Sequence, residues 1–159
     1  MARADARILV LGSLPGQRSL SEQEYYAHPQ NAFWSIMKEL FGIEGEYAER
    51  CRLLTEQEIA LWDVLRASVR PGSLDADIRV DSAKANDFAS FLGEHTLIEK
   101  ILFNGKKAEQ LFHRLVPTSH CQHLDLIGLP STSPAYAAMP FKGKLEIWED
   151  KLALVRKLN

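Results

Sequence analysis

Side chains that could hydrogen-bond to a ligand or stack on it are concentrated in "YYAHPQNAFW", residues 25–34. Tyr26 could be a platform on which an aromatic base stacks, although tyrosines also fill cores and surfaces. Asn31 stands at a predicted helix start, where its carboxamide could cap the helix or orient a water or a ligand. His28, taken alone, is more typical of a structural hydrogen bond than of a catalyst. This stretch is the leading candidate for a functional site.

A stiff, bare turn follows an apolar run near the start of the chain. "RILVLG" (7–12) leads into "GSLPG", in which Gly12, Pro15 and Gly16 leave little side-chain bulk. Such a turn either lets a phosphate or a ring approach the backbone or simply ends a strand. It is not a dinucleotide fingerprint, which needs GxGxxG, and no GK[ST] follows to make a Walker loop. On its own the turn leaves both interpretations open.

Two later turns carry groups that suit an anion. "FNGKKA" places Asn104, Gly105 and Lys106 at a strand-to-helix turn, where backbone N–H groups could bind an anion or only begin a helix. "LPSTSPAYA" presents three consecutive hydroxyls at residues 131–133. These hydroxyls can hydrogen-bond phosphates, or they can cap and turn the chain.

Other chemistries fit the residue pattern poorly. His113, His120 and His123 match the spacing of no closed structural zinc site, so no metal is expected. No G-x-S-x-G elbow is present for a hydrolase of the Ser-His-Asp type. The two cysteines, Cys51 and Cys121, are far apart and outside any CxxC, which fits a reduced, cytoplasmic setting and excludes a four-cysteine cluster within one chain.

Length and charge favour one globular domain. The chain has 159 residues, 46% of them hydrophobic, and a formal net charge of −2. The mild acidity argues against a dedicated nucleic-acid coat protein but permits binding to DNA through one local face. No apolar run approaches the length of a membrane span. The first apolar stretch is interpreted as a strand rather than a signal peptide.

Strands and helices are predicted to alternate along the chain. The predicted strands cover residues 7–12, 58–65, 98–105 and 123–130. The predicted helices cover residues 31–42, 83–95, 106–116 and 144–158, and a loop covers 66–80. Alternation of this kind predicts an α/β fold with a mainly parallel sheet. Ligands bind beyond the carboxyl ends of such strands, so the three turns are expected on one rim.

The combination of motifs is more specific than any one of them. "GSLPG", "YAHPQNAFW", "FNGKKA" and "LPSTSPAYA" together resemble the uracil-DNA glycosylase superfamily, in that order and over most of the chain. In the branch acting on G:U and G:T mismatches, a Gly-x-Asn-Pro-Gly motif precedes an "AHPxNxFW" stretch, and a Pro-Ser-containing loop closes the site. The form "GSLPGxxSLxxxxYYAHPxNxFW" looks like the hypoxanthine-DNA glycosylase branch.

Two departures from the wider family bear on the chemistry. Many members carry an Asn or Asp at the middle of the first motif to handle the attacking water, whereas this chain has Leu14, which cannot hydrogen-bond. The closing loop reads "STSPAYA" where uracil-excising relatives have a His-Pro-Ser or Asn-Pro-Ser form. The hypoxanthine branch also lacks the first-motif polar group, and the resemblance implies that Asn31 takes over the key catalytic position.

The resemblance implies a monofunctional DNA glycosylase that flips a deaminated base, hypoxanthine above all, and hydrolyses its N-glycosidic bond to leave an abasic site. It implies a single three-layer α/β/α domain over residues 1–159, with a central sheet of four to five strands, and no cofactor or metal. The implied base pocket comprises Gly12, Ser13, Leu14, Pro15, Gly16, Tyr26, His28 and Asn104. The implied DNA contacts come from Lys106, Ser131, Thr132, Ser133, Ala135 and Tyr136, of which Ala135 or Tyr136 would fill the gap left by the base.

Three alternatives remain open from the sequence. One is excision of uracil or of thymine opposite guanine. Another is a non-catalytic α/β module that binds damaged DNA or a nucleotide, and the third is an unrelated small-molecule hydrolase. In the leading interpretation the partner is DNA containing deaminated bases, no membrane is involved, and the protein is expected to be a cytoplasmic monomer.

Overall fold

Four parallel strands form the central sheet of the computed structural model, which describes residues 1–72 and 74–156, with side chains up to residue 152. In sheet order these strands are β2 (Ile59–Asp63), β1 (Ile8–Gly12), β5 (Lys100–Asn104) and β6 (Asp125–Leu129). Each of the three neighbouring pairs is parallel. The predicted mainly parallel sheet is confirmed.

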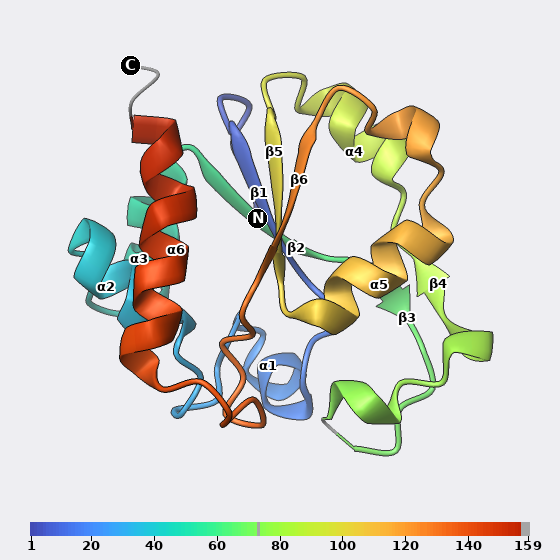
Figure 1. Cartoon of the computed structure of the whole chain (residues 1–159), viewed down its shortest axis with the longest axis horizontal. Coiled ribbons are helices and arrows are strands. Elements are labelled where there is room, and N and C mark those ends of the chain that lie inside the picture. Colours follow the sequence, from blue (N-terminus) through green and yellow to red (C-terminus); the bar gives the residue numbers. More distant parts are fainter. Residues whose placement is uncertain (73, 157–159) are drawn as a thin grey trace.

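Helices cover both faces of this sheet (Figure 1). On one side lie α2 (Phe33–Phe41), α3 (Tyr47–Glu56) and α6 (Phe141–Arg156), and on the other lie α4 (Phe88–Glu94) and α5 (Lys106–Leu115). The three-layer α/β/α arrangement is therefore confirmed. None of the helices in the described part of the chain is long and apolar enough to cross a membrane.

Burial on both faces explains why β1 is apolar without alternation. Every residue of β1 is buried. Val10 belongs to the hydrophobic cluster that includes Trp148 of α6, whereas Leu11 belongs to the cluster that includes Phe112 of α5. A strand packed on both sides needs apolar residues at successive positions, as "ILVLG" provides.

Two helices were not predicted from the sequence. These are α1 (Gln17–Glu22), which buries none of its residues, and α3, which buries only Leu54. α1 has no apolar stripe, and α3 has only a short one, Tyr47, Cys51 and Leu54, set among charged residues. These two helices therefore depend on the segments that flank them more than on an apolar pattern of their own.

Several predicted boundaries differ from the observed ones. The strand expected over 58–65 ends at Asp63, and the chain then forms the short strand β3 (Leu65–Ala67), which pairs antiparallel with β4 (Lys84–Ala85). The helix expected over 83–95 begins only at Phe88, because Asp87 caps it by accepting from the Ser90 N–H. The closing helix starts at Phe141 rather than 144, and the predicted residues 157 and 158 lie outside the described part.

Single-turn 3-10 helices occupy the connections. Two of them, Asp75–Asp77 and Val80–Ser82, lie in the segment between β3 and β4 that was expected to be a plain loop. The third, Thr118–His120, precedes β6. The segment between β3 and β4, α1 and the loop after β6 all lie beyond the same end of the sheet in Figure 1. That end holds the carboxyl ends of the strands, where ligands of such folds bind.

Candidate active site

A cavity of about 1010 Å³ opens at the carboxyl end of the sheet. It is formed by the turn after β1, the segment before α2, the start of α5 and the loop after β6. The structure brings every residue of the predicted site to this cavity: Gly12, Ser13, Leu14, Pro15, Gly16, Tyr26, His28, Asn31, Asn104, Lys106, Ser131, Thr132, Ser133, Ala135 and Tyr136. Their individual roles stay predictions.

Gly12 ends β1 where two polar side chains need space. A Cβ added to Gly12 would lie 2.6 Å from Asp63 Oδ1 and 3.6 Å from the Tyr26 hydroxyl oxygen. Any side chain at this position would therefore displace the Asp63 carboxyl. The bare turn serves a close approach of side chains to the backbone, and it does more than end a strand.

The turn after Gly12 is held from outside by the segment between β3 and β4. The Arg70 guanidinium, 4% exposed, donates to the Leu14 carbonyl oxygen at 3.3 Å and also to the Pro15 carbonyl oxygen. The Ser13 hydroxyl donates to the Asp75 carboxylate. Sequence reasoning treated this segment as a loop and missed Arg70 and Asp75, because nothing local pairs them with a turn about 60 residues earlier.

Tyr26 presents an aromatic ring to the cavity. It stacks on Phe33 of α2, with ring centroids 4.3 Å apart and planes inclined by 28°. Its backbone adopts the left-handed conformation, with φ of 57°, which is unusual for a bulky residue. Burial, followed by the nearby Asp63 charge, raises the pKa of the Tyr26 hydroxyl, so the hydroxyl remains a hydrogen-bond donor.

Asn31 supports the start of α2 and also lines the cavity, while its role toward a ligand stays a prediction. Its Oδ1 accepts from the N–H of Phe33, the first residue of α2, at 3.0 Å; the N-cap position itself is held by Ala32. Its own backbone N–H donates to the His28 carbonyl oxygen at 2.8 Å. The bond to Phe33 uses one of the two lone pairs of the amide oxygen, and the Nδ2 group has no hydrogen-bond partner among the described residues, so Nδ2 can donate to a ligand.

Asn104 and Thr132 form a buried brace between β5 and the closing loop. Asn104 Nδ2 donates to Thr132 Oγ1 at 2.8 Å, and the Thr132 N–H donates to Asn104 Oδ1, also at 2.8 Å. The Thr132 carbonyl oxygen accepts from the Ala32 N–H at 2.9 Å. These bonds fix the second and third motifs against the last one, so Asn104 and Thr132 support the cavity wall.

Gly105 allows the closing loop to approach the start of α5. Its φ of 97° is accessible mainly to glycine, and an added Cβ would lie 2.9 Å from Ser131 Cβ. Exposed Lys106 follows directly and begins α5. Tyr136, 39% exposed, lies farther along the loop, with Lys144 Nζ 5.2 Å from its ring centroid. The mouth of the cavity therefore carries a cation, hydroxyls and an exposed aromatic ring.

Asp63 is a cavity residue that the sequence reasoning missed. It ends β2, is only 8% exposed, and lines the cavity beside Gly12. Burial, followed by the charge of Asp75, raises the pKa of its carboxyl to about 7. The sequence contains a signal for it, because the apolar strand "IALWD" ends on an acid at the end of the sheet where ligands bind. The strand predicted over residues 58–65 runs past this acid and so hides it.

Metal ligands do not gather in the described part of the chain. No group of three or more His, Cys, Asp or Glu residues there is placed to hold an ion. His113 lies on α5 with its ring 5.8 Å from that of Phe103, and His120 lies in the turn before β6. The polar groups lining the cavity are amides, hydroxyls, backbone groups, carboxyls, amines, the Arg18 guanidinium and a single imidazole, that of His28.

Comparison with known proteins adds three findings. The family model of the uracil DNA glycosylase superfamily matches residues 1–152. Hypoxanthine DNA glycosylases of Methanosarcina barkeri and Methanosarcina acetivorans are 36% and 35% identical over 107 residues, which is 65% of this chain and 66% of each relative. A solution NMR structure of a Methanosarcina acetivorans protein, provisionally named a uracil DNA glycosylase, superposes with a TM-score of 0.76 at 30% identity, covering 95% of this chain and 91% of that one.

Proposed function

This chain belongs to the uracil DNA glycosylase superfamily, and we propose that it is a monofunctional DNA glycosylase that excises hypoxanthine from DNA and leaves an abasic site. The observation that carries the proposal is that four separate sequence motifs meet around one cavity. The aligned segment spans 66% of each hypoxanthine DNA glycosylase, just under two thirds of its length.

The cavity has the features that an extruded nucleotide requires. Tyr26 offers a ring that is held rigidly against Phe33 and can face a flipped base. Lys106 and the hydroxyls of Ser131 and Ser133 lie at the mouth, where the phosphates of the flipped nucleotide and its neighbours would pass. Tyr136 is exposed beside them and can occupy the space that the base vacates.

The polar groups suit cleavage of an N-glycosidic bond. In that reaction positive charge develops on the sugar and negative charge on the departing base. Preorganised donors aimed at the base lower the barrier without reorganising during the reaction. Such donors are the Nδ2 group of Asn31 and the backbone N–H groups of the turn at Ser13 and Gly16. The reaction needs only water as co-substrate.

We propose hypoxanthine rather than uracil as the substrate for two reasons. The chain has apolar Leu14 where uracil-excising relatives place a polar group, and the two curated relatives are named hypoxanthine DNA glycosylases. Uracil or mismatched thymine is the second candidate, favoured by the provisional name of the structurally similar protein.

Side-by-side excision assays test the proposal. Duplex oligonucleotides carrying a single inosine, uracil or G:T mismatch are incubated with the protein, and abasic sites are then cleaved with alkali. We expect cleavage of the inosine strand only after alkali treatment, and faster than cleavage of the uracil strand. Faster uracil release would reassign the substrate. Binding to inosine DNA without release of any base would favour the non-catalytic module.

A further inference from the structure

Asp63 faces the cavity without a partner of its own. It is only 8% exposed. Among the described residues, burial and neighbouring charges act on its carboxyl, and no hydrogen bond does. Its backbone is fixed, because its carbonyl oxygen accepts from Asn86 Nδ2 at 2.8 Å and it pairs in register with Gly12. The carboxyl occupies the space that the missing Gly12 side chain leaves open. A rigid, buried acid is thus held at the cavity with its hydrogen-bonding capacity unused.

The depth of Asp63 indicates which part of a nucleotide it would meet. Asp63 and Ser13 are 8% and 6% exposed at the inner end of the cavity, whereas Lys106 and Tyr136 are exposed at its mouth. A flipped nucleotide enters base first and remains joined to the DNA at the mouth. The group at the inner end therefore faces the base and not the phosphates.

On the basis of the proposed function, we propose that Asp63 is a catalytic residue that donates a proton to N7 of the departing hypoxanthine. As the C1′–N9 bond breaks, its electron pair stays with the base and the carboxyl proton bonds to N7, so the base leaves as a neutral molecule. The attacking water bonds to C1′ through its oxygen and releases one proton to solvent. Asp63 then takes one proton from solvent, and the sum of the steps consumes one water.

Burial keeps the proton of Asp63 available near neutral pH. Burial is the largest cause of the raised pKa, the charge of Asp75 adds to it, and the amino group of Met1 and Arg70 oppose it. The hydroxyls of Tyr25 and Tyr26 interact electrostatically with this carboxyl, and burial, followed by its charge, raises the pKa of both hydroxyls. A carboxyl whose pKa is raised to about 7 can give a proton to a weakly basic ring nitrogen, which an exposed aspartate at that pH cannot.

The pH dependence of single-turnover inosine excision tests the acid role. For the wild-type chain we expect the rate to fall about tenfold per pH unit above roughly pH 7, because the acidic form is lost there. Asp63→Asn should lower the rate at pH 6 by about 10²- to 10³-fold and remove this alkaline limb. Asp125→Asn, an exposed acid-to-amide change at the opposite end of the sheet, is the matched control and should leave rate and profile unchanged.

A substrate analogue tests the atom that receives the proton. 7-Deaza-2′-deoxyinosine replaces N7 with C–H and cannot be protonated there. The ratio of wild-type to Asp63→Asn rates should fall from about 10²-fold or more with inosine to within about threefold with the analogue. An equally large ratio with both substrates would overturn the assignment to N7.

Asp75→Asn supplies a test that leaves Asp63 in place. The amide can still accept from Ser13, but it removes the negative charge that raises the pKa of Asp63. The alkaline limb should therefore shift to lower pH. An unshifted limb, or an Asp63→Asn variant that folds and keeps the wild-type rate and profile, would overturn the inference while the proposed function stands. If wild-type protein releases no hypoxanthine, the proposed function fails and this inference fails with it.

Discussion

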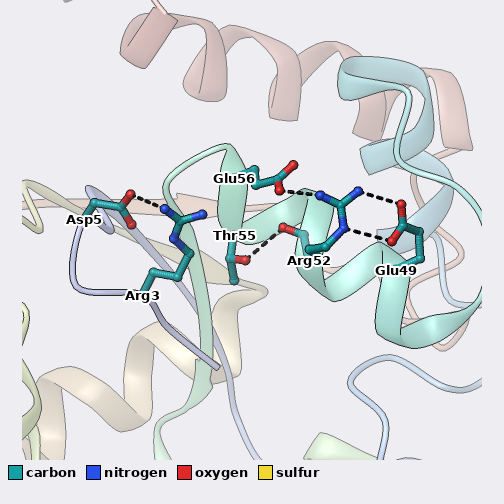
Figure 2. A network of polar contacts seen from close by, with 6 residues as sticks. All are labelled: Arg3, Asp5, Glu49, Arg52, Thr55 and Glu56. Carbon is teal, nitrogen blue, oxygen red and sulfur yellow. Dashed lines mark hydrogen bonds and ion pairs between the residues drawn. The ribbon is translucent and has the colours of Figure 1, made fainter.

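Charged side chains on the surface of α3 differ from the acid in the cavity in whether they have a partner. On α3, the Arg52 guanidinium lies between Glu49 and Glu56, with Arg52 Nη2 2.7 Å from Glu49 Oε1, and all three side chains are exposed (Figure 2). In the cavity, Asp63 is buried and has no hydrogen-bonding partner for its carboxyl among the described residues. The exposed charges of Arg52 and its two neighbours are paired, and the buried carboxyl of Asp63 at the cavity has no hydrogen-bond partner among the described residues.

The difference teaches where to look for function. Exposed ion pairs are screened by water and salt and add little to stability. A buried, unpaired carboxyl is costly, and a fold retains one where a ligand provides what the protein does not. The amide of Asn31 follows the same rule in part, because its oxygen accepts from the first N–H of α2 while its nitrogen has no partner among the described residues.

Filling the space at Gly12 should have the largest effect on activity, because it displaces the buried carboxyl of the cavity. In Gly12→Val the new Cβ would lie 2.6 Å from Asp63 Oδ1 and displace the carboxyl. We expect single-turnover inosine excision to fall by at least about 100-fold, because small misplacements of reacting groups have effects of that size. Gly93→Ala, on α4 with no atoms within 4 Å of the new Cβ, is the control and should keep the wild-type rate. Activity within threefold of wild type in Gly12→Val would show that this space is dispensable.

Substitutions of Asn31 separate its two halves. Asn31→Ala loses both the oxygen that accepts from the first N–H of α2 and the Nδ2 donor, whereas Asn31→Asp keeps an oxygen that accepts from Phe33. Both variants should lose most of their excision rate, by about 100-fold or more. Only the alanine variant should also lose stability, by about 1 kcal/mol in urea unfolding. Near-normal excision by Asn31→Asp would return the catalytic role to the oxygen.

Asp63→Asn should make the protein more stable at neutral and alkaline pH. The folded-state pKa of about 7 lies above the unfolded value of 3.8, so the folded state holds more protons between these pH values. Wild-type stability should therefore fall as pH rises from about 4 to about 7 and then level off. The asparagine variant removes this loss, which amounts to about 2–4 kcal/mol at pH 8. Urea unfolding of both proteins at pH 4 and pH 8 measures it, and an equal difference at the two pH values would contradict the burial of an ionisable carboxyl.

Removing the exposed ion pairs of α3 should have the smallest effect on stability and activity. Arg52→Ala removes the contacts to Glu49 and Glu56 without exposing any buried charge. We expect the unfolding midpoint to move by less than about 2 °C and the excision rate to stay unchanged. Thermal unfolding at low and high salt checks this, since any effect should shrink as salt rises. A larger shift would mean that α3 depends on these pairs for its formation.

Several parts of this fold could be predicted because their signal is local. The continuous apolar run of β1 and the Gly42 that ends α2 in a left-handed conformation need no distant contact to be recognised. The helix α1 and the start of α4 were missed or misplaced for the opposite reason. The six residues of α1 bury nothing, and a short strand, β4, occupies the residues where α4 was expected to begin.

The sequence alone determined the α/β class, the shared rim and the motif residues that line the cavity, because parallel strands bring their carboxyl ends together whatever else surrounds them. Only the tertiary structure decided that Asn104 is engaged by Thr132 and that Arg70 holds the first turn. It alone also decided that Asp63 is buried beside Gly12 with its pKa raised. Desolvation and long-range charge depend on what packs around a group, and no local pattern in the chain contains that information.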